Sequence, residues 1–99
     1  MKEPVLKNNH SILIVDDEPN NIQLLGNILK SQQYDVEFAL NGLEALDWVE
    51  SNQFDLIMLD VSMPDLDGFA VCRKIRENER LKEVPVIFLS ALKELDDKI

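Results

Sequence analysis

The stretch LIMLDVSMPDLDG, residues 56–68, combines the features that decide the fold. Its first four residues, Leu56 to Leu59, form an unbroken apolar run, which is typical of a parallel strand covered on both faces. The run ends in a carboxylate at Asp60, and Met-Pro and Asp-Gly pairs that favour turns follow. The rest of the sequence explains why a strand that looks buried ends in a charge.

The chain alternates between strand and helix patterns on both sides of this stretch. Strands are predicted over residues 12–15, 34–39, 54–59 and 85–89. Helices are predicted from Pro19 to about Gln32, after Asn41, after Asp67, and from Lys93 onward. This alternation with short connections predicts an α/β fold, a doubly wound parallel sheet with helices on both faces.

Each predicted helix carries an apolar stripe at three- and four-residue spacing. The residues expected to pack on the sheet are Ile22, Leu25 and Leu29 with Leu24 and Ile28 beside them, then Leu43, Leu46 and Val49 with Trp48 at the margin, then Phe69, Cys72 and Ile75. Asn41 and Glu44 resemble a capping box at the start of the second helix. Cys72, the single cysteine, is predicted to be a small core residue.

Length and composition limit the functional classes. The 99 residues suffice for one domain, with residues 1–10 as a flexible polar lead-in. The net charge of −9 disfavours binding to nucleic acid and to an anionic membrane, because both need clustered Lys and Arg. No apolar segment reaches the length of a membrane span or resembles a signal peptide, so we expect a cytoplasmic protein.

Polar residues follow three of the four predicted strands. Asp16 and Asp17 follow the first strand, Asp60 the third and Ser90 the fourth. Each residue alone is typical of a turn or a helix cap. The strands of a parallel sheet all end at the same edge, however, and ligands bind there. We therefore expect these groups to converge, and Asp60 need not be buried because its strand delivers it to the rim of the sheet.

Three converging carboxylates indicate a cation or retained protons. Each pair of charges at about 4 Å costs about 4 kcal/mol at an effective dielectric constant of about 20. All-oxygen ligands favour a hard cation, and an open site that keeps water favours Mg²⁺. A cation beside a carboxylate indicates phosphoryl chemistry, in which an Asp oxygen attacks phosphorus and forms an aspartyl phosphate.

Three ordered motifs resemble those of the response-regulator receiver domain, the phosphoacceptor half of two-component signalling. ILIVDDEP (12–19) resembles its first strand and acidic pair, DLIMLDVSMPDLDG (55–68) its phosphoacceptor strand, and PVIFLSA (85–91) its fourth strand with a switch hydroxyl. The resemblance covers residues 11–99 and implies a flavodoxin-like fold with strand order 2-1-3-4.

The resemblance also implies a role for each site residue. Asp60 is the expected phosphoacceptor, and Asp16, Asp17 and Asp60 are expected to bind Mg²⁺ together with the backbone carbonyl of Ser62. Ser90 is the expected switch hydroxyl. The family continues into a fifth strand that bears a lysine, which this chain lacks before its last residue, Ile99; we therefore expect an incomplete domain.

The absent fifth strand has a structural consequence. Residues 86–89 would form an exposed apolar edge of the sheet, and such an edge invites pairing with another chain. We therefore expect self-association or strand swapping through the fourth strand.

The predicted function is a phosphorylation-dependent switch. A histidine kinase or phosphotransfer protein would supply the phosphoryl group to Asp60, so the domain is a phosphoacceptor and not an enzyme acting on other substrates. One alternative is a protein-interaction module without phosphotransfer. A Mg²⁺-dependent phosphatase is disfavoured, because that chemistry wants an acid two residues after the nucleophile, where Ser62 stands.

Overall fold

A computed structural model describes residues 10–89 of the chain. Ser90 and the helix predicted from Lys93 lie outside the described residues, as does the predicted lead-in apart from His10. The elements are β1 (Ser11–Val15), α1 (Pro19–Ser31), β2 (Asp35–Ala39), α2 (Gly42–Ser51), β3 (Leu56–Leu59), α3 (Gly68–Arg76), a short 3₁₀ helix (Glu79–Leu81) and β4 (Val86–Phe88). No helix among residues 10–89 combines the length and the apolar character that crossing a membrane requires.

The four strands form one parallel sheet in the order β2-β1-β3-β4, which confirms the predicted strand order. Val15 is in register with Ala39 on one side and with Leu59 on the other, and Leu59 is in register with Phe88. The carboxyl ends of all four strands therefore lie at one edge of the sheet.

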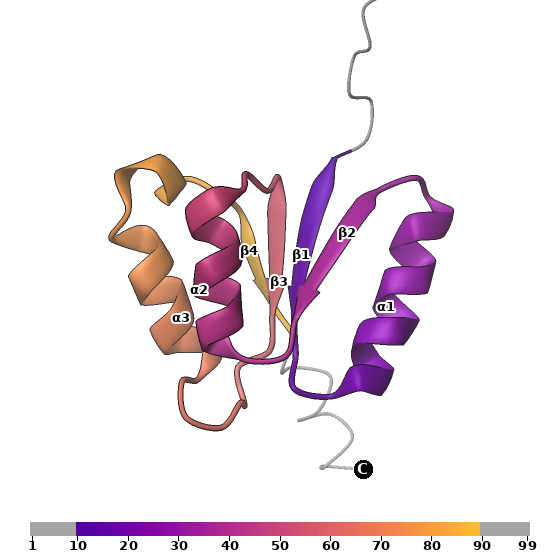
Figure 1. The fold of residues 1–99 in the computed structure, drawn as a ribbon, viewed down its shortest axis with the longest axis horizontal. Coiled ribbons are helices and arrows are strands. Elements are labelled where there is room, and N and C mark those ends of the chain that lie inside the picture. Colours follow the sequence, from indigo (N-terminus) through magenta and orange to yellow (C-terminus); the bar gives the residue numbers. More distant parts are fainter. Residues whose placement is uncertain (1–9, 90–99) are drawn as a thin grey trace, which may run out of the picture.

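Helices cover both faces of the sheet, with α1 on one face and α2 and α3 on the other (Figure 1). Alternate residues of β1 serve the two cores, because successive side chains of a strand point to opposite faces. Leu13 and Val15 pack in the core under α2 and α3, whereas Ile12 and Ile14 pack with Ile22 of α1. A strand covered on both faces needs apolar residues at every position, which explains its unbroken run.

The predicted helix stripes are partly wrong. Leu24, Ile28, Leu43 and Phe69 are 62%, 52%, 67% and 51% exposed, respectively. Each helix here touches the sheet along one narrow line, so residues beside that line face outward. The buried residues lie one turn apart on that line: Ala45 and Val49 in α2, Val71 and Ile75 in α3. Cys72 is half-buried and packs against this core.

Side-chain caps begin α2 and α3 where the sequence predicted them. Asn41 Oδ1 accepts a hydrogen bond from the Glu44 backbone N–H at 2.9 Å, and Asp67 Oδ1 accepts one from the Ala70 N–H at 2.8 Å. The return bond of the capping box differs from the usual one, since Glu44 Oε1 accepts from the N–H of Leu40 at 3.1 Å. The Glu44 carboxylate thereby provides a hydrogen-bond acceptor for the N–H of Leu40, the first residue after β2.

Replacing the α2 cap tests this local account. We expect Asn41→Ala to lower the free energy of unfolding by about 1 kcal/mol, because an N-terminal N–H of the helix loses its acceptor. Asn41→Ser should retain most of the stability, since its hydroxyl accepts the same bond. Urea unfolding followed by circular dichroism measures both variants; an equal loss for Ser and Ala would contradict a capping role.

Candidate functional site

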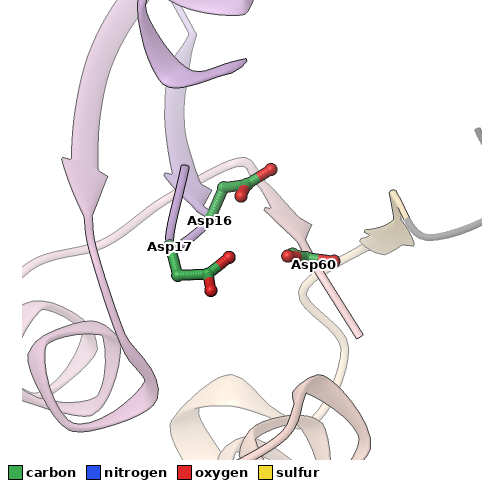
Figure 2. Close-up of side chains that lie close together, drawn as sticks. All are labelled: Asp16, Asp17 and Asp60. Atoms are coloured by element: carbon green, nitrogen blue, oxygen red, sulfur yellow. The ribbon is translucent and has the colours of Figure 1, made fainter. Parts of the chain in front are cut away.

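Three carboxylates converge at the carboxyl edge of the sheet. Asp16 and Asp17 directly follow β1, and Asp60 directly follows the neighbouring β3. One oxygen of each side chain can be chosen so that all three lie within 4.8 Å of one another. Figure 2 shows the side chains of Asp16 and Asp17 beside that of Asp60. The predicted convergence of these residues is therefore found in the structure.

Backbone hydrogen bonds hold the two strand ends in place. The Asp60 N–H donates to the Val15 carbonyl at 2.8 Å, and the Asp16 N–H donates to the Ala39 carbonyl at 3.1 Å. These bonds continue the sheet ladders one residue beyond the strands. The Cα positions of both aspartates are thus fixed by the sheet and not by a loop.

The burial of Asp60 differs from the expectation that its strand delivers it to an accessible rim. Asp60 is 0% exposed and Asp16 only 2%, whereas Asp17 is exposed. The loop between β3 and α3 folds back over the strand end, and the Gly68 N–H donates to the Val61 carbonyl at 2.9 Å. Asp17 is therefore the open side of the cluster.

Gly68 makes this close approach feasible. A Cβ atom at this position would lie 2.3 Å from the Asp60 carbonyl oxygen and 2.8 Å from the Cα of Val61. Both neighbours are backbone atoms and cannot rotate away. The absence of a side chain at residue 68 is thus a condition for the packing of α3 against the strand that ends in Asp60.

Neighbouring donors orient the two buried carboxylates. Asp16 Oδ1 accepts from the Glu18 N–H at 2.9 Å, and Asp16 Oδ2 accepts from Asn21 Nδ2 at 3.3 Å. Asp60 Oδ1 accepts from the Ser62 N–H at 3.2 Å. The contact of Asn21 with Asp16 was not predicted from the sequence. The position of this amide in the first turn of the helix that follows the acidic pair could have indicated it.

The cluster suits a hard cation. Its donors are all carboxylate oxygens, and charges about 4–5 Å apart repel by about 3–4 kcal/mol per pair at an effective dielectric constant of about 20. A divalent cation such as Mg²⁺ removes that repulsion, and the exposed side at Asp17 leaves room for the waters that Mg²⁺ retains. The residues present therefore fit the predicted metal.

The roles of two other predicted site residues, Ser62 and Ser90, stay predictions. The structure places Ser62 beside Asp60 through its N–H, and the role of its carbonyl as a metal ligand stays a prediction. Ser90 lies outside the described residues, and its role as a switch hydroxyl also stays a prediction.

Known proteins are similar to this chain in both sequence and fold. The transcriptional regulator RpaA of Synechocystis is 42% identical over 88 residues, which are 89% of this chain and 36% of RpaA. The chemotaxis response regulator CheY4 of Vibrio cholerae superposes with a TM-score of 0.80 at 32% identity, over 82% of this chain and 68% of CheY4. The chain thus spans about a third of the length of RpaA.

A third similar protein carries a metal. The receiver domain of the sensor histidine kinase PA1611 from Pseudomonas aeruginosa has a TM-score of 0.77 at 34% identity, over 81% of this chain and 66% of that domain. Its structure holds a magnesium ion in the active site cleft. The sequence profile of the response regulator receiver domain matches residues 12–99. Motifs, strand order and carboxylate cluster agree with that match, and the chain belongs to the response regulator receiver domain family.

Proposed function

We propose that this chain accepts a phosphoryl group on Asp60 and acts as a phosphorylation-dependent switch of a two-component system. The observation that carries the proposal is the position of Asp60, whose carboxylate is fixed at the end of β3 within 4.8 Å of two further carboxylates. A side chain held at the end of a strand is a well-oriented nucleophile.

Mg²⁺ would be held by oxygens of Asp16, Asp17 and Asp60 and by the carbonyl of Ser62. When bound, it would neutralise the negative charge that carboxylates and phosphoryl oxygens bring together. The presence of a magnesium ion in the similar domain of PA1611 supports this assignment.

In the reaction, the phosphoryl group moves from an oxygen or nitrogen atom of the donor to an oxygen of Asp60. An oxygen of the Asp60 carboxylate attacks phosphorus, forming the new O–P bond as the bond from phosphorus to the donor breaks with its electron pair. Acetyl phosphate would release acetate, and a phosphohistidine would release imidazole, which takes up a proton. The Asp60 carboxylate supplies the electron pair of the new O–P bond.

The proposed donor in the cell is a histidine kinase or a phosphotransfer protein, in a cytoplasmic setting. Ser90, as the switch hydroxyl, would donate to a phosphoryl oxygen and couple the modified Asp60 to the surface beyond β4. Family membership and the exposed Asp17 side of the cluster support this assignment, since a donor needs one open approach to the site.

Labelling with a small phosphoryl donor tests the proposal. We expect incubation with acetyl phosphate and Mg²⁺ to add the mass of one phosphoryl group to the intact chain, and peptide mapping to place it on Asp60. Removing Mg²⁺ with EDTA should suppress the gain, because the charges then repel the donor. A folded chain, as judged by circular dichroism, that gains no mass would contradict phosphoacceptor chemistry in residues 1–99.

We also propose self-association through β4. Among residues 10–89 this strand pairs only with β3, while Ile87 and Phe88 are 48% and 37% exposed. Sedimentation velocity should show a dimer that grows with concentration, and Ile87→Lys should shift it to monomer because a charge blocks edge pairing. A parent chain that stays strictly monomeric at tens of micromolar would contradict the proposal.

A further inference from the structure

The opposite edge of the sheet is formed by β2, which pairs only with β1 among the described residues (Figure 1). In a parallel pair, alternate residues direct their backbone groups to the neighbouring strand. Asp35 donates to His10 and Ala39 accepts from Asp16, so residues 35, 37 and 39 face β1. The backbone groups of Val36 and Phe38 consequently face the free edge.

Part of this edge is already occupied by α2. The indole Nε1 of Trp48 donates to the Phe38 carbonyl at 3.1 Å, and Glu44 Oε1 accepts from the Leu40 N–H at 3.1 Å. The N–H and C=O of Val36 and the N–H of Phe38 have no hydrogen-bond partner among residues 10–89. These three groups form a short open edge, bounded on one side by Trp48.

An apolar groove lies beside this edge on the α1 face. It has a volume of about 290 Å³, and its apolar walls are Ile22 of α1 and, from the β2 side, Val36, Phe38 and Leu40. Phe38 is 52% exposed and Leu40 42%. Gly26 contributes to the hollow, since a Cβ at this position would have no atom within 4 Å beyond its own helix.

The other side of the same edge is acidic. Glu37 of β2 is exposed and lines a hollow of about 910 Å³ together with Trp48 and one basic side chain, Lys30. The adjoining hollow along α2 is lined by Glu44 and Asp47 as well as Trp48. The two sides of one strand edge thus differ in chemistry, with apolar walls toward α1 and more carboxylates than basic groups toward α2.

We propose that the free edge of β2 binds an extended segment of a partner protein in which apolar side chains alternate with Lys or Arg. An added strand would pair with the backbone groups of Val36 and Phe38. Its side chains would alternate between the two faces of the sheet, as in any strand. Apolar side chains would enter the α1 groove, and basic side chains would face Glu37 on the α2 side.

Charge argues for a basic partner and against a second copy of this chain. Two β2 edges brought together would place Glu37 of each copy near the other, and the chain carries a net charge of −9. This docking edge lies at the end of the sheet opposite to β4, so it is separate from the proposed self-association.

Binding of a designed peptide tests the proposal. The probe is an acetylated and amidated peptide of four Val-Lys repeats. Its controls are four Val-Glu repeats and a peptide with the same Val and Lys residues in two separate blocks. We expect the alternating Val-Lys peptide to bind at least about tenfold more tightly than either control, as reported by the fluorescence of Trp48, the single tryptophan. Hydrogen exchange should slow at the Val36 and Phe38 amides.

Two variants locate the site. Val36→Pro removes the outward N–H but leaves the ladder to β1 intact, and proline is tolerated on such an edge. Glu37→Lys reverses the charge on the α2 side. Each should weaken binding by about tenfold or more, with an unchanged far-UV spectrum. If Val36→Pro unfolds the chain, the proposal is tested by the peptide affinity of Glu37→Lys and by the protection of the Val36 and Phe38 amides in the parent chain.

Three outcomes would overturn the proposal. The first is equal affinity for the alternating and the block peptide, which would mean charge attraction without strand pairing. The second is no binding up to about 1 mM, a free energy weaker than about −4 kcal/mol. The third is protection of Val36 and Phe38 that rises with protein concentration alone, which would assign the edge to a second copy.

Discussion

Asp60→Asn should gain no mass from acetyl phosphate and Mg²⁺ under conditions in which the parent chain is fully modified. An amide is a far weaker nucleophile than a carboxylate and cannot form the acyl phosphate. The fold should survive, because Asn retains an oxygen that accepts from the Ser62 N–H, as Asp60 Oδ1 does at 3.2 Å. Intact mass and circular dichroism measure the two effects separately.

The same substitution should also change the response of stability to metal. Without Mg²⁺ the variant should unfold at a higher temperature than the parent, because one of three mutually repelling carboxylates has gone. Adding Mg²⁺ should stabilise the parent and have little effect on the variant, since a ligand that binds the native state raises its stability.

Asp65→Asn is a matched control for these measurements. Asp65 is an exposed aspartate in the loop that follows Asp60, and its φ of 69° suits Asn as well as Asp. It should be labelled and stabilised by Mg²⁺ like the parent. Labelling that persists in Asp60→Asn, or is lost in Asp65→Asn, would contradict Asp60 as the acceptor.

Of the three Gly→Ala substitutions that the chain offers, Gly68→Ala should be the most destabilising. The new Cβ would lie 2.3 Å from the Asp60 carbonyl oxygen and close to the backbone at Val61, so α3 or the strand end must move. Overpacking against rigid atoms costs about 3 kcal/mol, and more where nothing relaxes. Because the displaced atoms include the backbone of Asp60, phosphoryl labelling should also slow in the fraction that stays folded.

Gly26→Ala provides the opposite expectation with the same chemical change. Gly26 lies inside α1, and its Cβ would meet nothing within 4 Å beyond its own helix. Alanine should therefore raise the free energy of unfolding by about 0.5–1 kcal/mol through helix propensity. Chemical unfolding of both variants measures the difference. Similar changes for the two glycines would contradict the close contact at residue 68.

The strands were predictable because their signals are local, whereas their order was implied by the resemblance to receiver domains. Unbroken apolar runs identified β1 and β3, since a strand covered on both faces has no polar position. Asn41 and Asp67 identified two helix starts, because a side-chain acceptor at an N-cap acts within three residues. Each predicted strand begins and ends within two residues of the observed one.

The convergence of Asp16, Asp17 and Asp60 was predictable for a similar reason. Parallel strands end at one edge, so a polar residue that follows each apolar run must lie there. Asp60 could thus be placed beside Asp16 and Asp17, which lie more than forty residues earlier in the sequence, without coordinates.

Burial and contact are what the sequence left undecided. Leu43 and Phe69 fit a helical apolar stripe, yet both are more than half exposed. Helical periodicity predicts which side of a helix faces the sheet, but not how wide the contact between helix and sheet is. The hydrogen bond from Asn21 to Asp16 depends on where the first turn of α1 begins in space.

Patterns along the chain were enough to identify the strands, two side-chain caps and the carboxylates that meet at the end of the sheet. The burial of Asp60, the exposure of Asp17 and the need for a glycine at residue 68 became visible only in the folded arrangement. Strands and caps depend on neighbours along the chain, whereas exposure and steric contact depend on how a loop folds back over the sheet.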